Sequence, residues 1–132
     1  MRRLHGDTLD YTQQRNQFGK PLASFQALQH RMVDMLMALT HSASLADRAI
    51  ASLSDSDADR ARMVSAAKVY VGKAARLCGQ QAVQLHGGMG MTDELAVGFF
   101  FKRAIEIERQ FGTVDHHLTR YERLSFADQL AA

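Results

Sequence analysis

The sequence holds one cysteine, one proline and no tryptophan in 132 residues. The lone Cys78 rules out an internal disulfide and any zinc site built on paired cysteines. Because Pro21 is the only proline, long stretches carry no helix breaker, and no clear alternation of apolar and polar residues indicates β-strands. These absences favour an all-helical chain.

Charge and hydrophobicity argue against two other classes of protein. The 16 basic and 14 acidic residues are interspersed and leave a formal net charge of +2, which provides no basic patch for nucleic acid. No apolar run reaches the roughly 18 residues of a membrane span, and the N-terminus lacks the apolar core of a signal peptide. We therefore expect a soluble, cytoplasmic protein with neither a nucleic-acid nor a membrane partner.

Helical periodicity and turn residues divide the chain into five segments. The expected helices cover residues 2–16, about 24–53, about 57–85, about 94–110 and 114–126. Gly19 and Pro21 mark the first turn, and Ser24 is expected to cap the second helix. Serines and aspartates in 54–59 suit the start of the third. The short loops predict an all-α, antiparallel four-helix bundle with a short extra C-terminal helix, a single domain over 1–132.

The first segment with chemical potential runs from Arg15 to Pro21 and is followed by Phe25 and Gln26. An arginine beside a tight turn can offer several hydrogen-bond donors to a phosphate. It can equally pair with the last carbonyls of its own helix, which favour cations. The spacing leaves both interpretations open.

The second segment is the glycine cluster that follows the third helix. Gly87, Gly88 and Gly90 lack a Cβ, so their backbone can approach a phosphate closely. A helix rather than a strand precedes them, so the cluster is not a dinucleotide fingerprint of the strand–turn–helix type. A flexible turn that ends the helix is the alternative.

The third segment contains the paired histidines His116 and His117. Adjacent helical positions point about 100° apart, so both rings rarely reach one ion. No cysteine or carboxylate stands at a convincing ligand spacing, and we expect no metal. Thr113 is expected to cap the last helix, with both histidines partly exposed.

In their order along the chain, these segments resemble the C-terminal domain of acyl-CoA dehydrogenases. The pieces that carry the resemblance are Arg15 to Gln26, Ala67-Lys68, Gln84 to Gly90, Lys102-Arg103-Ala104 and Gly112-Thr113. Together they cover nearly the whole chain. The stretch from Gln84 to Glu94 is similar to the bacterial branch that includes pimeloyl-CoA dehydrogenase small subunits.

The resemblance implies a flavoprotein of fatty acid metabolism, an oxidoreductase that uses FAD and acts on the CH–CH group of acyl-CoA thioesters. It also implies that FAD lies between subunits of a homo- or hetero-oligomer, a dimer or tetramer. Arg15 would reach the FAD pyrophosphate, and Phe25 and Gln26 the adenine side. The full set of implied cofactor contacts is Arg15, Gln17, Phe18, Phe25, Gln26, Gln84, Gly87, Gly88, Thr113 and Asp115.

Two departures from the family pattern separate cofactor binding from catalysis. The family's N-terminal helical domain and its β-domain, which cover the flavin and the acyl-CoA, are absent from this sequence. Phe111 stands just before Gly112-Thr113, where many members carry the catalytic glutamate. Another branch places its glutamate on the first helix of the bundle, upstream of Met1, so the catalytic base is unknown.

Three alternatives remain open. The chain is part of a working dehydrogenase whose remainder brings the base. It is instead a catalytically silent subunit or truncated bundle that completes a partner's FAD site or mediates oligomerisation. Or it is a plain helical bundle used for association or for nothing. We expect the isolated chain to be inactive, to bind FAD weakly, and to self-associate through its apolar faces.

Overall fold

The computed structural model describes residues 1–130 and confirms the all-helical architecture. Its α-helices are α1 (Arg2–Gln14), α2 (Gln26–Ala51), α3 (Asp57–His86), α4 (Val97–Arg109) and α5 (Val114–Leu130). Short 3₁₀ turns lie at Leu22–Ser24, Ser52–Ser54 and Gly87–Met91. In this part of the chain, none of the helices is both long enough and apolar enough to cross a membrane.

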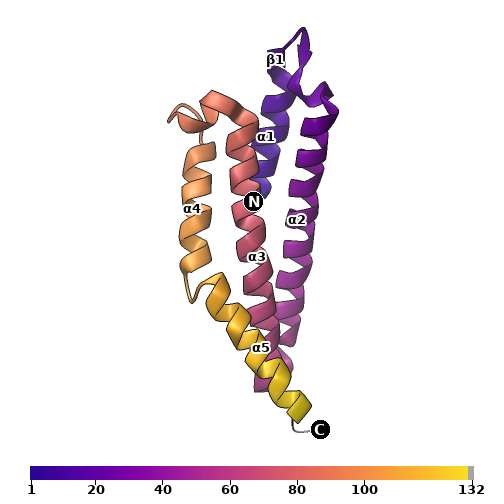
Figure 1. Ribbon diagram of the computed structural model, residues 1–132, viewed down its shortest axis with the longest axis vertical. Coiled ribbons are helices and arrows are strands. Elements are labelled where there is room, and N and C mark those ends of the chain that lie inside the picture. Colours follow the sequence, from indigo (N-terminus) through magenta and orange to yellow (C-terminus); the bar gives the residue numbers. More distant parts are fainter. Residues whose placement is uncertain (131–132) are drawn as a thin grey trace.

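The central helix is α3, which contacts each of the other four helices. Figure 1 shows α1, α2, α3 and α4 alternating in direction, which is the antiparallel bundle that the sequence predicts. After a bend, α5 continues from α4 and runs obliquely along the lower half of α3 (Figure 1). The short α1 extends from the middle of the bundle to its upper end, so α1 and α3 end close to each other.

The core lies in the upper half, where the first four helices meet. Leu4, Met35 and Val97 are at most 2% exposed, and burial of a side chain of this size stabilises the fold by about 1.5–3 kcal/mol. The buried residues of α3 that face them are small: Ala74, Cys78 and Ala82. Gly79 completes this seam, because a Cβ there would lie 2.2 Å from the Cδ2 atom of Phe101. Small residues on α3 therefore let α2 and α4 approach it closely.

The helix caps confirm one prediction and correct another. Ser56 caps α3, since its Oγ accepts a hydrogen bond of 3.2 Å from the backbone N–H of Asp59. The prediction for Ser24 is wrong. Its Oγ donates to the carbonyl of Pro21 at 2.7 Å, inside the 3₁₀ turn, and Phe25 occupies the N-cap position of α2. The hydroxyl makes a local bond instead of meeting the first N–H groups of the helix.

The first turn contains a small hairpin that the sequence did not indicate. Strand β1 (Asn16–Gln17) pairs antiparallel with β2 (Lys20–Pro21). Phe18 and Gly19 form its tip with positive φ angles of 55° and 79°. Glycine adopts this conformation easily, whereas it is uncommon for a bulky residue such as phenylalanine.

Two helix boundaries also differ from expectation. The fourth helix begins at Val97 rather than near Glu94, because the residues between Thr92 and Val97 form turns. The last helix reaches Leu130, so it is longer than the short extra helix expected.

Candidate functional site

A pocket of about 470 Å³, which we call the glycine pocket, opens where α1 and α3 end. Its lining residues are Tyr11, Arg15, Gln17, Leu22, Leu28, Gln84, Leu85, His86, Gly87, Gly88 and Met89. Five of the residues singled out in the sequence therefore line one cavity: Arg15, Gln17, Gln84, Gly87 and Gly88. They come from two segments that lie far apart in the sequence and meet only in the fold.

Arg15 provides the charge of this pocket. Its backbone N–H donates to the carbonyl of Tyr11 at 2.8 Å and ends α1. Its exposed guanidinium forms no ion pair or hydrogen bond with any residue that the structure describes. The sequence left open whether Arg15 pairs with its own helix carbonyls, and this pairing is not made. The guanidinium donors are available to an anion in the pocket.

The turn after α3 borders the pocket with bare backbone. Gly87 has a positive φ of 57°, and its N–H donates to the carbonyl of Gln84. A Cβ at Gly87 or Gly88 would meet no atom within 4 Å, so both face open space. At Gly90, by contrast, a Cβ would lie 2.5 Å from the carbonyl oxygen of Val83, and this glycine packs against α3. The N–H of Gly87 is therefore used to end the helix. Because Gly87 has no side chain, a ligand can still approach its backbone closely.

Three predicted contacts lie beside the pocket rather than in its lining. The Phe18 side chain is 89% exposed and packs edge-to-face on Phe25, with ring centroids 6.2 Å apart. The Nζ of Lys20 lies 4.3 Å from the centroid of the Phe25 ring, close enough for a cation–π attraction. Gln26 is exposed at the first position of α2. These residues form an aromatic and cationic rim at the hairpin.

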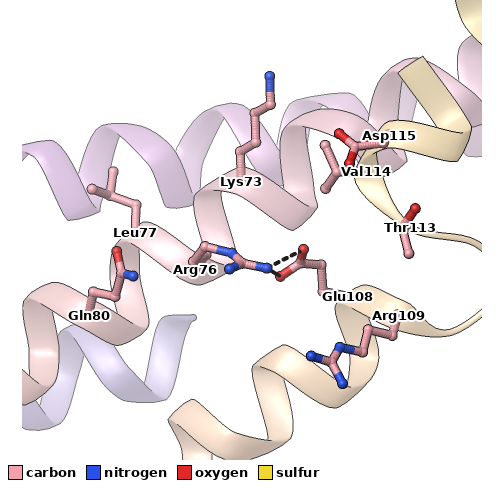
Figure 2. Close-up of a pocket in the computed structure, with 9 residues that line it drawn as sticks. All are labelled: Lys73, Arg76, Leu77, Gln80, Glu108, Arg109, Thr113, Val114 and Asp115. Carbon is pink, nitrogen blue, oxygen red and sulfur yellow. Dashed lines mark hydrogen bonds and ion pairs between the residues drawn. The ribbon is translucent and has the colours of Figure 1, made fainter. Parts of the chain in front are cut away.

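A second pocket of about 520 Å³ lies where the end of α4 and the start of α5 meet α3, and we call it the ion-pair pocket. Its lining residues are Lys73, Arg76, Leu77, Gln80, Glu108, Arg109, Thr113, Val114 and Asp115. Figure 2 shows them around the contact between Arg76 and Glu108. Thr113 and Asp115 therefore line a different cavity from Arg15.

The ion pair itself is close and partly buried. One guanidinium nitrogen of Arg76 lies 2.8 and 3.0 Å from the two carboxylate oxygens of Glu108. The Glu108 carboxylate is buried, whereas the Arg76 side chain is half exposed. The hydrogen bond to Glu108 and its negative charge raise the pKa of Arg76, against an opposing effect of burial. A buried carboxylate needs such a partner, so the pair holds the end of α4 against α3.

Two side chains clamp the loop between α4 and α5. Lys68 Nζ donates to the carbonyls of Glu108 at 3.1 Å and Gln110 at 2.8 Å, which satisfies acceptors at the end of α4. His117 Nε2 donates to the carbonyl of Phe111 at 3.0 Å. Phe111 has a positive φ of 61° and is 93% exposed. The clamped loop thus holds an aromatic residue in an uncommon conformation with its ring in solvent.

The start of α5 confirms one expectation and corrects another. Thr113 caps the helix, since its Oγ1 accepts a 3.3 Å hydrogen bond from the N–H of His116. His117 is buried, so the prediction that both histidines are partly exposed is wrong for this residue. Its Nδ1 lies 3.4 Å from the Ser65 hydroxyl, which accepts from Arg120 at 3.3 Å. The residues described include no group of three or more histidines, cysteines or carboxylates able to hold a metal ion.

Comparisons with known proteins identify the family of this chain. The family model described as acyl-CoA dehydrogenase, C-terminal domain, matches residues 1–121. The acyl-CoA dehydrogenase IpdE2 of Mycolicibacterium smegmatis is 34% identical over 115 residues, 87% of this chain. The short-chain specific acyl-CoA dehydrogenase of Mus musculus mitochondria is 34% identical over 103 residues, 78% of this chain. The chain belongs to the acyl-CoA dehydrogenase family.

Solved structures show the same fold for this acyl-CoA dehydrogenase domain. The FAD complex of PigA matches with a TM-score of 0.85 and 28% identity, and the match covers 92% of this chain and 32% of PigA. A variant of the steroid ACAD Tcur3481–Tcur3483 matches with a TM-score of 0.89 and 25% identity, over 98% of this chain and 35% of that one. The chain also spans 35% of IpdE2 and 25% of the mouse enzyme, about a third of its relatives or less.

Sequence reasoning missed two features of this acyl-CoA dehydrogenase domain. Tyr11 and His86 contact each other at the glycine pocket. The spacing of four residues between Tyr11 and Arg15 in the predicted first helix could have indicated that Tyr11 lies near the site. The pairing of Arg76 with Glu108 joins residues 32 positions apart, and no local pattern signals it.

Proposed function

We propose that this chain is the FAD-contacting helical domain of an acyl-CoA dehydrogenase-type oxidoreductase, which acts on the CH–CH group of acyl-CoA thioesters. The observation that carries the proposal is the glycine pocket, which joins Arg15 and Gln17 to Gln84 and Gly88. Family membership and the likeness to the FAD complex of PigA support it. We assign acyl-CoA binding to the parts of the relatives that this chain does not span.

The residues of the glycine pocket fit the pyrophosphate of FAD. The unpaired guanidinium of Arg15 presents a fork of donors that matches phosphate oxygens. The open backbone at Gly87 and Gly88 removes the Cβ atoms that would keep a phosphate away. Among the described residues, no acidic side chain lines the pocket to repel it. When bound, FAD supplies the hydride acceptor, and the residues of this chain bind and orient it.

The remaining predicted contacts imply a cofactor shared between subunits. Thr113 and Asp115 line the ion-pair pocket, so in this proposal they meet a dinucleotide held by another subunit. An oligomer also agrees with the surface of α2, where Val33, Leu36 and Met37 share one face and are about half exposed. A second copy or a related subunit covers this face. The domain works as one unit with its partner subunit in the cytoplasm.

One observation favours a second candidate, a catalytically silent subunit that completes a partner's FAD site or mediates oligomerisation. Phe111 cannot accept a proton, yet its loop is held by Lys68 and His117. Glu108 is buried and paired with Arg76, which leaves it poorly placed to take a substrate proton. The part of the chain that the structure describes therefore provides no assigned base, and in this candidate the partner subunit supplies it.

The cofactor proposal is tested by titrating the purified 132-residue chain with FAD while recording backbone amide signals by NMR. Weak binding with shifts concentrated at Arg15, Gln84 and Gly88 is expected, because the chain forms only part of the site. Riboflavin, which lacks the pyrophosphate, is the matched control and is expected to leave these signals unchanged. Absence of shifts with FAD, or equal shifts with riboflavin, would overturn the proposal.

A second measurement separates the working enzyme from the silent subunit. The chain is co-expressed with its genomic neighbours, and the purified complex is examined for a visible flavin spectrum. If the complex works as a dehydrogenase, acyl-CoA bleaches the bound flavin. If this chain is a silent subunit, the flavin is bleached only in complexes that contain a second, catalytically complete subunit.

A further inference from the structure

Two side chains that are not among the predicted cofactor contacts, Tyr11 and His86, meet at the glycine pocket. Their rings stack with centroids 4.3 Å apart and planes inclined by 27°. The Tyr11 hydroxyl also donates a 3.3 Å hydrogen bond to the backbone carbonyl of His86. One residue belongs to α1 and the other is the last residue of α3. This contact links the two segments that build the pocket.

The contact lies next to both of the groups that the pocket offers to a ligand. Tyr11 lies four positions before Arg15, the residue that ends α1, and both line the glycine pocket. His86 directly precedes Gly87, whose own Cβ position has no neighbour within 4 Å. The Gly87 N–H bond to the Gln84 carbonyl ties the turn to α3. The contact of His86 with Tyr11 ties the same end of α3 to α1.

The His86 ring is itself fixed. The residue is buried, and its Nδ1 lies 2.8 Å from the carbonyl oxygen of Ala82. A carbonyl can only accept, so Nδ1 carries a hydrogen and donates it. The ring cannot turn without losing this bond or the stack on Tyr11. The contact between His86 and Tyr11 therefore fixes the end of α3 relative to α1.

We propose that Tyr11 and His86 are positioning residues that set the distance between the Arg15 guanidinium and the Gly88 turn. With this distance held, both groups reach one pyrophosphate. Neither residue needs to touch the ligand. The identity of the ligand rests on the proposed function, whereas the link between α1 and the end of α3 does not.

The ligand arm of the test uses ADP, which carries the pyrophosphate, and the full chain observed by NMR. Tyr11→Leu removes the ring and the hydroxyl and is expected to weaken ADP binding about five- to tenfold, comparable to losing one hydrogen bond. Tyr11→Phe keeps the ring and is expected to lose about twofold. Tyr121→Leu is the matched control, an exposed tyrosine on α5, and is expected to bind as the wild type does.

A double-mutant cycle separates positioning from general destabilisation. Arg15→Lys keeps the cation but removes the fork of donors. If Tyr11 acts by aligning Arg15, the effect of Tyr11→Leu shrinks in the Arg15→Lys background. Wild-type affinity in Tyr11→Leu, or the same loss in both backgrounds, would overturn the proposal.

The ligand-free arm uses hydrogen exchange of the Gly87 amide, which donates to the carbonyl of Gln84. Tyr11→Leu is expected to speed this exchange while the amide of Cys78 in the core stays protected. If that variant does not fold, Tyr11→Phe still removes the bond to His86, and exchange about two- to fivefold faster is expected. Unchanged exchange at Gly87 overturns the link. Absence of ADP binding by the wild type would contradict the proposed function. The exchange measurement at Gly87 would still test whether Tyr11 and His86 link α1 to the end of α3.

Discussion

The two pockets share α3 but differ in how their charges are used. In the glycine pocket, Arg15 has no partner in the described structure, and bare backbone at Gly88 faces open space. In the ion-pair pocket, Arg76 and Glu108 neutralise each other, and Lys68 binds the carbonyls beside them. The first pocket keeps its donors for a ligand. The second uses the pair of Arg76 and Glu108 to hold the end of α4 against α3.

This difference predicts that changes in the ion-pair pocket affect stability, whereas changes in the glycine pocket affect ligand affinity. Gly72 of α3 packs against two residues of the ion-pair pocket. A Cβ at Gly72 would lie 2.7 Å from Cγ2 of Val114 and 3.2 Å from Cγ of Glu108. The glycine pocket has no such close contact at Gly87 or Gly88. Substitutions in each pocket, with matched controls, can therefore separate stability from affinity.

The largest effect is expected from Gly72→Ala. Val114 is β-branched and lies at the start of α5, so it cannot easily turn away from the added methyl group. Overpacking of this kind lowers the free energy of unfolding by about 1–3 kcal/mol, measurable by urea denaturation. Gly6→Ala is the control, because nothing lies within 4 Å of its Cβ position in α1. That change is expected to stabilise by up to about 1 kcal/mol. Equal stability of both variants would show that α5 can shift.

The next effect concerns affinity. Arg15→Met removes the unpaired guanidinium and is expected to weaken ADP binding about 10- to 150-fold, because hydrogen bonds to charged groups contribute about 1.5–3 kcal/mol. Its urea midpoint is expected to stay near that of the wild type, since no described residue loses a partner. Arg109→Met is the matched change in the ion-pair pocket and is expected to leave ADP affinity within about twofold. Similar losses in both variants would remove the distinction between the pockets.

The difference between the two pockets also separates what could be predicted from the sequence from what could not. The helices were predicted because their signals are local, such as the turn after Arg15 and the glycines after Gln84. These two segments were assigned to one cofactor site only through the family resemblance, because each alone left two interpretations open. The ion-pair pocket depends on contacts across 32 and 40 positions, made by Arg76 and Lys68 with the end of α4. Amino-acid spacing cannot show which helices pack together.

The two errors at single residues have similar physical causes. Ser24 has the right chemistry for an N-cap, but a closer acceptor in the 3₁₀ turn takes its hydroxyl. His117 is polar, but α5 runs along α3 and buries it beside Ser65. Propensity describes what a side chain can do, and the packing around it decides which partner it meets.

A smaller loss of stability is expected from Lys68→Met, which leaves the carbonyls at the end of α4 without their donor. Lys68 and its two hydrogen bonds are only partly buried. The substitution is therefore expected to lower the free energy of unfolding by about 1 kcal/mol, measured by urea denaturation. Lys68→Arg can still donate to both carbonyls and is expected to recover most of the loss. Lys73→Met is the control, because Lys73 has no partner among the described residues. A Lys73 variant as unstable as the Lys68 variant would contradict the clamp.

The smallest effect is a dependence of stability on pH at His117. Burial lowers the pKa of this residue most, the hydrogen bond to the Phe111 carbonyl opposes that change, and the charges of His116, Lys68 and Arg120 lower the pKa further. The unfolded chain, with a histidine pKa of about 6.5, therefore binds a proton more readily than the folded chain.

The contribution of His117 is thus complete above about pH 6.5 and is lost as the pH falls through the lower pKa of the folded state. Urea midpoints measured between neutral and mildly acidic pH are expected to fall less in His117→Gln than in the wild type, since glutamine can donate to the Phe111 carbonyl but does not titrate. His30→Gln is the control, an exposed histidine on α2, and is expected to keep the wild-type dependence. If the His117 variant and the wild type lose stability in parallel, protonation of His117 is not the source of the pH dependence.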